Sequence, residues 1–311
     1  MTMWNRFFLL GVVLTICACN KLEDMPQDIQ EDIPPVVVDP TPTKQVYLDV
    51  SLGANFSHKW GDLDSISMFV MRDEQMDIEH PENNNVPAVY RYGAWSIESP
   101  ITITDDKWKA YAYYPYTANL ESFKVPIVSG DSVRRMVGKT ALPFGFHNNN
   151  IVIEMWQPVA LVTVYVRKQG KVERKVVDQV RLYKKNSGLP IEGLLDILSQ
   201  SITYTKMGDY VKSDLGYEVS SAQSAEPIDI EVLPTYQQTK AATVDLSSPT
   251  YLELMINDSP FSAELPKAVT EWESGNHYTI NVIYNNDVVT IESVSIRPWN
   301  TEHLEIFPEE Q

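Results

Sequence analysis

The feature of this sequence that most limits its fold is a succession of short segments with alternating apolar side chains, beginning at Val46. Residues 46–52 read Val-Tyr-Leu-Asp-Val-Ser-Leu, and residues 278–284 read Tyr-Thr-Ile-Asn-Val-Ile-Tyr. A period of two places alternate side chains on opposite faces of a strand, so such segments predict β-strands. Glycine, proline, asparagine and aspartate separate the segments, as expected for turns. We therefore predict an all-β fold.

Three further segments refine this prediction. Residues 159–166 form a continuous run rich in β-branched side chains, which is typical of a strand buried on both faces. Residues 278–284 and 288–296 flank an Asn-Asn-Asp turn, which predicts a β-hairpin. The one helical candidate is residues 191–198, but Gly193 and the short length weaken it. Many short strands at regular spacing favour β-sandwiches.

The N-terminus predicts a lipoprotein signal peptide over residues 1–18. Arg6 is the only charged residue before the first lysine, and a 12-residue apolar run follows it. A membrane-spanning helix needs roughly 17–25 apolar residues, so this run has the length of a cleaved signal peptide. Residues 16–19, Ile-Cys-Ala-Cys, resemble a bacterial lipobox, which predicts signal-peptidase cleavage between Ala18 and Cys19 and lipid on Cys19. An ordinary secretory signal with incidental cysteines is the alternative.

Residues 19–45 predict an acidic, proline-rich tether between this lipid and the folded part of the chain. They contain five prolines and six acidic residues. Proline disfavours helix, and like charges extend a chain. The stretch at residues 20–24 resembles the export signal of Bacteroidetes surface lipoproteins, so we expect the protein on the surface of the outer membrane. Lipid on Cys19 would hold it there, because several acyl chains bind a membrane durably.

The chain that follows the signal is long enough for two domains. About 290 residues are more than one typical hydrophobic core accommodates. The basic run RKQGKVERK at residues 167–175 is predicted to be a solvated turn between the two, with a docking site for an acidic partner as the alternative. We place one β-sandwich at residues 46–170 and a second at residues 171–311.

Composition and motifs argue against several classes of function. The formal net charge is −17, so we expect no nucleic-acid partner. The five histidines are scattered without the paired spacing of metal ligands, and there is no phosphate-binding loop or nucleophile elbow. Asp62 and Asp64 could be read as paired carboxylates, but their context is typical of a turn. We therefore predict no catalytic residue, no metal and no cofactor, and expect that the protein is not an enzyme.

Three aromatic stretches share their order and spacing with a known family. Residues 110–116 read Ala-Tyr-Ala-Tyr-Tyr-Pro-Tyr, residues 272–278 read Trp-Glu-Ser-Gly-Asn-His-Tyr, and Ile-Arg-Pro-Trp follows at residues 296–299. These stretches resemble motifs of the fimbrillin family of Bacteroidetes, surface lipoproteins that build fimbriae. Gln157 departs from the family, whose members usually have a histidine there. The resemblance assigns a structural motif role to Tyr113, Tyr114, Pro115, Trp272, Gly275, Tyr278 and Trp299.

The resemblance implies two transthyretin-like β-sandwiches in tandem and assembly into an adhesive fimbria by strand donation. One subunit offers an open sheet edge, and a segment of a neighbour adds to it and gains main-chain hydrogen bonds. The implied partners are other fimbrial subunits, with host or bacterial surface molecules as adhesion targets. The resemblance also implies that residues 193–198 and 201–205 form a β-hairpin. The alternating stretch 303–307 is either a donor strand or the last strand of its domain.

Proteolytic maturation is where the sequence departs from the fimbrillins that it resembles. Those proteins are trimmed after an arginine, but no arginine lies between Cys19 and Met71, where the basic side chains besides His58 are the lysines Lys21, Lys44 and Lys59. Lys44 is the predicted maturation site if the subunit is trimmed after lysine. An untrimmed subunit would keep its lipid and suit an anchor position.

The sequence also allows a second class of function, which is ligand binding. A monomeric surface lipoprotein could bind glycans or another ligand through exposed aromatic side chains, with Trp60, Trp95 and Trp108 as stacking platforms. Assembly separates the two hypotheses. A fimbrial subunit should form SDS-resistant oligomers, whereas a glycan-binding protein should stay monomeric and show coplanar aromatic rings beside a cleft.

Overall fold

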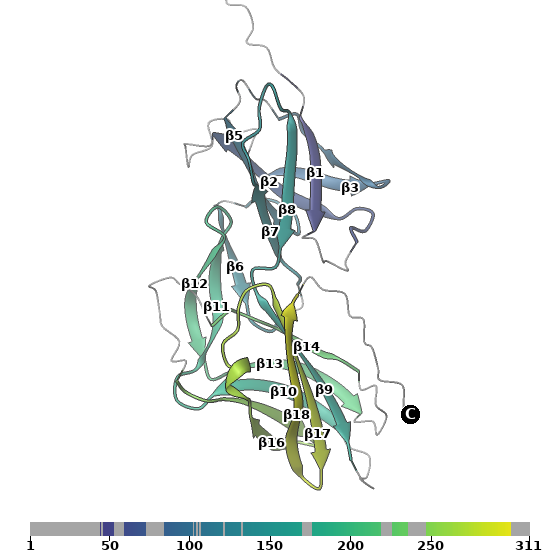
Figure 1. The fold of residues 1–311 in the computed structure, drawn as a ribbon, viewed down its shortest axis with the longest axis vertical. Helices are drawn as coiled ribbons and strands as arrows, with labels where there is room; N and C mark the ends of the chain where they lie inside the picture. Colours follow the sequence, from purple (N-terminus) through teal and green to yellow (C-terminus); the bar gives the residue numbers. More distant parts are fainter. Residues whose placement is uncertain are drawn as a thin grey trace, which may run out of the picture. The chain divides into compact units, whose positions relative to one another are not determined.

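The computed structural model describes most of the chain between Lys44 and Trp299. The described residues are 44, 46–52, 59–72, 84–101, 103, 105, 107–120, 122–131, 133–169, 176–218, 226–235 and 247–299. Most of these residues lie in β-strands, and the one helical element among them is the short 3₁₀ helix η2 (Lys267–Val269). The predicted all-β fold is therefore confirmed (Figure 1). No helix in this part of the chain has the length and hydrophobicity to cross a membrane.

The first sheet has seven strands. In order across the sheet they are β1 (Tyr47–Leu52), β8 (Asn150–Trp156), β7 (Met136–Thr140), β5 (Trp108–Tyr114), β2 (Ser65–Arg72), β3 (Val86–Arg91) and β4 (Ala94–Ile97). β1 runs parallel to β8, and all other neighbours are antiparallel. Cα atoms of the two outermost strands, β1 and β4, come within 8 Å of each other, so the sheet curls around its own core.

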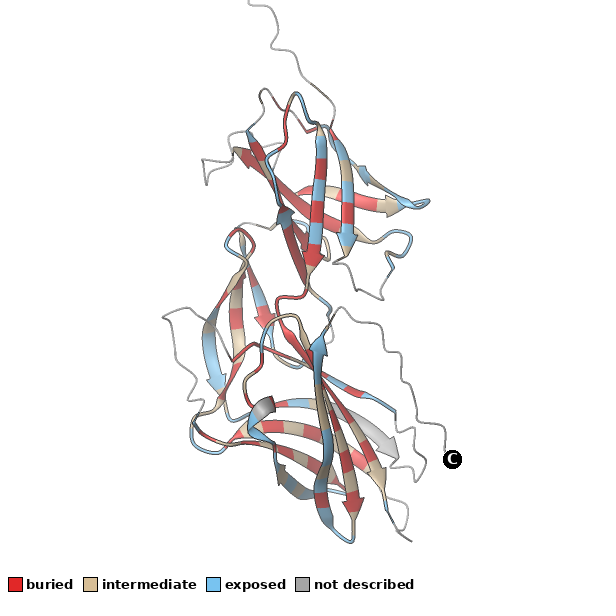
Figure 2. Ribbon diagram, viewed as in Figure 1, coloured by how far each residue is buried: buried red, intermediate tan, exposed pale blue. Residues whose placement is uncertain are grey.

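Both faces of this sheet are buried along β5. Trp108, Ala110 and Ala112 point into the core that the sheet encloses, whereas Tyr111 and Tyr113 belong to a second core. That second core includes side chains of a three-stranded sheet, β12 (Ser201–Gly208), β11 (Leu189–Asp196) and β6 (Lys124–Val128). Figure 2 shows the buried residues of these strands in red.

The remaining strands form a β-sandwich of two four-stranded sheets. One contains β13 (Tyr210–Glu218), β10 (Val176–Lys184), β15 (Thr250–Ile256) and β16 (Ser259–Glu264). The other contains β14 (Ile228–Val232), β9 (Ala160–Lys168), β17 (Asn276–Asn285) and β18 (Val288–Pro298). Their facing side chains form one apolar core, in which Trp272, Tyr278 and Tyr284 are the largest fully buried residues.

Three predictions for individual segments are confirmed. β9 lies between β14 and β17, and Val162 and Thr163, on its opposite faces, are both buried. β17 and β18 form the expected hairpin, with positive φ at Asn286 and Asp287, as the favoured two-residue turn requires. Residues 193–198 begin within β11, which pairs antiparallel with β12, so this segment starts a hairpin and not a helix.

The domain boundary near residue 170 stays a prediction. β6 and β9 precede it, yet β6 pairs with β11, and β9 pairs with β14 and β17, which follow it. The transthyretin-like detail of the two sandwiches is likewise still a prediction. The signal peptide, its cleavage site at Ala18 and Cys19, the tether up to residue 43, and the stretch 303–307 lie outside the described residues.

Candidate assembly site and family motifs

The edge strand β1 is the first candidate site, because among the described strands it forms a ladder with one neighbour, β8. Its side chains alternate between the core and solvent, and β8 is the one described strand that hydrogen-bonds to it. Val50, which points into the core, is 3% exposed, whereas Tyr47, which points outward, is 63% exposed. The partly buried Leu48 and Leu52 pack against the same core as Val50.

β8 is the strand with which β1 pairs. Ile151, Ile153 and Met155 of β8 are fully buried, and the parallel register runs from Tyr47 opposite Asn150 onward. Without β1, the backbone groups of β8 that face it would lack partners, and the apolar core beside them would be open to water. If β1 were absent, a strand with apolar side chains at every second position could make the same contacts.

Two side chains fasten β1 near its ends. The Nζ atom of Lys44 donates a hydrogen bond to the carbonyl of Phe146 (2.9 Å) and lies 5.6 Å from the centre of that ring. The Nε1 atom of Trp60 donates to the carbonyl of Val50 (3.0 Å), and its ring packs edge-to-face against Trp95 at 5.0 Å. The contact between Trp60 and β1 was not foreseen, because no local sequence signal identifies the carbonyl that an indole will reach.

The Tyr-Tyr-Pro motif lies where β5 ends. Tyr113 is 2% exposed in the second core, and burial raises its pKa. Tyr114 donates its hydroxyl to the Asp64 carboxylate (3.0 Å), and burial, followed by this carboxylate, raises the pKa of Tyr114. The peptide bond between Tyr114 and Pro115 is cis. Asp64 also accepts a hydrogen bond from the Gly61 amide (2.7 Å), so this carboxylate stabilises a turn.

The C-terminal motif joins the ends of three strands. Trp272 and Tyr278 are each 1% exposed, each donates a 3.0 Å hydrogen bond to a backbone carbonyl within residues 269–271, and burial raises the pKa of Tyr278. Gly275 adopts φ = +74°, where an L side chain is disfavoured. Its amide donates to the carbonyl before β9, and its carbonyl accepts from Trp299, which is partly buried against the second core. These contacts suit structural roles for the motif.

The tryptophans considered for glycan stacking do not form an exposed platform. Trp108 is completely buried, with the guanidinium of Arg72 5.4 Å from its ring, so its proposed role is wrong. The physical reason is that Trp108 lies on the face of β5 that points into the core enclosed by the curled sheet. Trp60 and Trp95 are partly buried, and their ring planes stand at 84° to each other instead of lying coplanar.

A polar cluster on the outer face of β14, β9 and β17 was not foreseen either. Thr163 donates its hydroxyl to Asp229 (2.5 Å) and lies 2.7 Å from Nε2 of His277. The hydroxyl therefore lies between carboxylate and imidazole, whereas in a nucleophilic triad the imidazole occupies the central position. Among the described residues no group of His, Cys, Asp or Glu is arranged to hold a metal ion. The cluster cross-links three neighbouring strands.

The chain is similar to known proteins both in sequence and in fold. The chain matches the family model described as fimbrillin-like over residues 54–299. No curated protein matches it. Among solved structures, a candidate cell adhesion protein from Bacteroides uniformis is 12% identical, with a TM-score of 0.60 over 82% of this chain and 99% of that one. A second from Bacteroides ovatus is 15% identical, with a TM-score of 0.60 over 85% and 99%.

A fimbrial protein from Bacteroides vulgatus is also similar, at 12% identity and a TM-score of 0.50, over 82% of this chain and 99% of that one. At such identities the solved structures show a shared fold. The family model carries more weight, because it matches most of the chain and includes the three aromatic stretches from which the resemblance was predicted. The protein therefore belongs to the fimbrillin-like family.

Proposed function

We propose that this protein is a structural subunit of a cell-surface fimbria that serves adhesion and assembles by strand donation at the position of β1. Membership of the fimbrillin-like family and the similarity in fold to fimbrial and cell adhesion proteins support the fimbrial role. The observation that carries the assembly mechanism is the edge position of β1, whose ladder among the described strands is with β8 alone. β1 is the first described strand, and the fully buried Ile151, Ile153 and Met155 of β8 lie beside it.

A donated strand would take over the contacts of β1. Its backbone would hydrogen-bond to β8, and its alternate side chains would enter the core where Val50 and Leu48 now lie. Trp60 would then donate its indole hydrogen to a carbonyl of the donor, as it now does to Val50. The donor should therefore alternate apolar and polar side chains over about six residues, the length of β1.

The position of cleavage decides whether β1 leaves. Lys44 precedes β1, so maturation there would free the subunit from its lipid while leaving the strand in place. Lys59 follows β1 and is exposed, so cleavage there would remove the strand and open the acceptor. With neither cleavage, lipid on Cys19 keeps the subunit on the outer membrane, which suits an anchor. We propose Lys44 as the site that separates a released subunit from an anchored one.

N-terminal sequencing of the surface form, together with SDS gels of unheated samples, tests this function. We expect an SDS-resistant ladder of subunits and a free N-terminus that follows Lys44 or Lys59. A Cys19→Ala variant should lose membrane attachment. A ladder with Cys19 lipidated in its shortest member would place this chain at the base. Monomers alone, all blocked at Cys19, would contradict assembly and favour a monomeric surface lipoprotein.

A further inference from the structure

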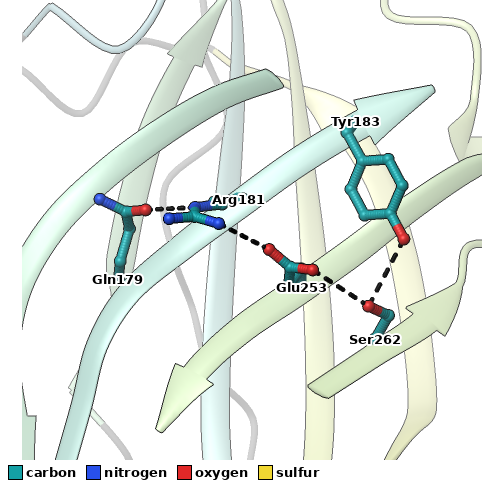
Figure 3. A network of polar contacts seen from close by, with 5 residues as sticks. All are labelled: Gln179, Arg181, Tyr183, Glu253 and Ser262. Atoms are coloured by element: carbon teal, nitrogen blue, oxygen red, sulfur yellow. Dashed lines mark hydrogen bonds and ion pairs between the residues drawn. The ribbon is translucent and has the colours of Figure 1, made fainter. Parts of the chain in front are cut away.

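A polar network crosses the outer face of the sheet β13-β10-β15-β16, as Figure 3 shows. On β10, Gln179 accepts a hydrogen bond from Nε of Arg181, and Nη1 of Arg181 donates to Glu253 on β15 (3.0 Å). On β16, Ser262 donates to Glu253 and accepts from the Tyr183 hydroxyl, each at 3.4 Å. Each side chain is oriented by its neighbour, so a ligand would meet a preorganised row of hydrogen-bonding groups.

Three tyrosines lie opposite one another on neighbouring strands beside this network. Tyr183 stacks on Tyr251 of the neighbouring strand, with ring centres 5.2 Å apart and planes only 18° from parallel. On the other side of β10, Tyr210 of β13 lies opposite Tyr183, and the Arg181 guanidinium lies 4.9 Å from its ring centre; Tyr210 is 42% exposed. Tyr183 and Tyr251 are themselves partly exposed. This tyrosine pair therefore has the nearly parallel rings that Trp60 and Trp95 lack.

A pocket of about 520 Å³ adjoins the stacked pair, and Tyr183 is part of its lining. Its other walls are the turns at residues 184–188 and 207–209. The volume lies within the usual range of small-molecule sites, roughly 300–1,000 Å³. Ser187 is one of the lining residues, and its buried hydroxyl has no hydrogen-bond partner within the described structure. A buried hydroxyl without a partner is costly, and a polar ligand or water would satisfy it.

The charges around this surface are balanced. Arg181 is paired with Glu253, and the pocket lining combines Lys185 with Asp209. Lys184, almost completely buried, directs its Nζ atom to the carbonyl of Ser248 (2.8 Å). The site therefore offers many donors and acceptors without a dominant sign, which favours a neutral polar ligand over an ionic one.

We propose that this face, the tyrosine pair and the adjoining pocket together bind a neutral glycan. The C–H face of a sugar ring packs on an aromatic ring, and its hydroxyls both donate and accept hydrogen bonds, as the amide, carboxylate and guanidinium groups of the network require. One sugar unit would stack on the exposed side of the tyrosine pair, and its neighbour would enter the pocket beside Ser187. The proposal goes beyond the assembly role, since it involves none of the contacts of β1.

Binding of defined polysaccharides to the detergent-solubilised full-length protein tests the proposal. The immobilised chain is exposed to four neutral probes, mannan, dextran, xylan and galactan, and to two anionic ones, heparin and polygalacturonate. We expect at least one neutral polysaccharide to bind. Tyr183→Ala should weaken that binding by about tenfold or more, since loss of one stacked ring costs on the order of one tenfold step. Tyr92→Ala is the matched control and should bind normally, because Tyr92 is 97% exposed in the turn between β3 and β4.

A second variant keeps the test decisive if Tyr183→Ala fails to fold. Glu253→Gln keeps the shape of the side chain but weakens its hold on Arg181, and should reduce binding several-fold. Both variants should still form the SDS-resistant ladder, so loss of glycan binding is distinguishable from loss of assembly. Failure of all neutral probes to bind, binding of the anionic probes alone, or equal binding by wild type and both variants would overturn the proposal.

Discussion

Replacing Val50 by alanine should loosen β1 without unfolding the rest of the protein. Val50 is 3% exposed and packs in the core that the curled sheet encloses. The change removes two carbon groups at about 0.8 kcal/mol each, and the cavity left behind adds to this, so we expect a loss of about 2 kcal/mol. That loss should raise the population of molecules with β1 detached roughly 30-fold.

Hydrogen exchange measures this detachment at individual amides. Amides of β8 that hydrogen-bond to β1 should exchange roughly 30-fold faster in Val50→Ala, whereas amides in β15, within the core of the C-terminal sandwich, should keep their wild-type rates. Asp49→Ala is the matched control, because Asp49 lies on the exposed face of the same strand. It should leave both sets of amides nearly unchanged.

Equal acceleration in β8 and β15 would refute the reasoning, because β1 would then open only when the whole protein unfolds. Unchanged exchange in β8 would refute it differently, by showing that Val50 contributes little to holding the strand. In either case β1 would not be an independently replaceable element, and strand donation at this position would lose its physical basis.

Three other predictions concern stability, and denaturant unfolding measures each. Gln157 is completely buried, and its two side-chain amide atoms have no hydrogen-bond partner in the described structure. Gln157→Met should therefore raise the free energy of unfolding by about 1–3 kcal/mol. A decrease in that free energy would show that the amide has a further partner such as water. Burial raises the pKa of Glu231 from 4.5 to about 7, so the unfolded state ionises first as pH rises. The free energy of unfolding should therefore fall by roughly 2–3 kcal/mol between about pH 4.5 and 7. Glu231→Gln should abolish this contribution to the pH dependence. Gly275→Ala should cost about 1–2 kcal/mol because of its positive φ, whereas Gly61→Ala, in a turn with ordinary space for a Cβ atom, should cost much less.

The sequence predicted the elements of this fold better than their partners. Alternation over residues 46–52 and 278–284 is a local signal, and both segments are strands. The partner of β1 is β8, about one hundred residues away, and no local pattern specifies that their pairing is parallel. For the same reason the sequence did not show that β6, which precedes the predicted domain boundary, pairs with β11, which follows it.

Burial was hardest to predict where both faces of a strand are covered. In β5, Trp108 and Ala110 point into the core that the sheet encloses, and the second core covers Tyr111 and Tyr113 on the opposite face. The sequence alone allowed Trp108 to be a ligand platform, but it is buried in the enclosed core. Conversely, Tyr183 and Tyr251 lie far apart in the sequence, and only the pairing of β10 with β15 makes them a stacked pair.

The position of β1 within the chain makes it the most replaceable strand of its sheet. β5 lies between β7 and β2, so removing it would break two ladders and open two cores. β4 is the other edge strand, but a tight turn at Tyr92 and Gly93 joins it to β3, so it cannot leave without disturbing that hairpin. β1 is the first strand among the described residues, and the one described ladder that it forms is with β8. Exchanging it requires no threading and costs only its own contacts, which a donated strand with the same alternation would restore.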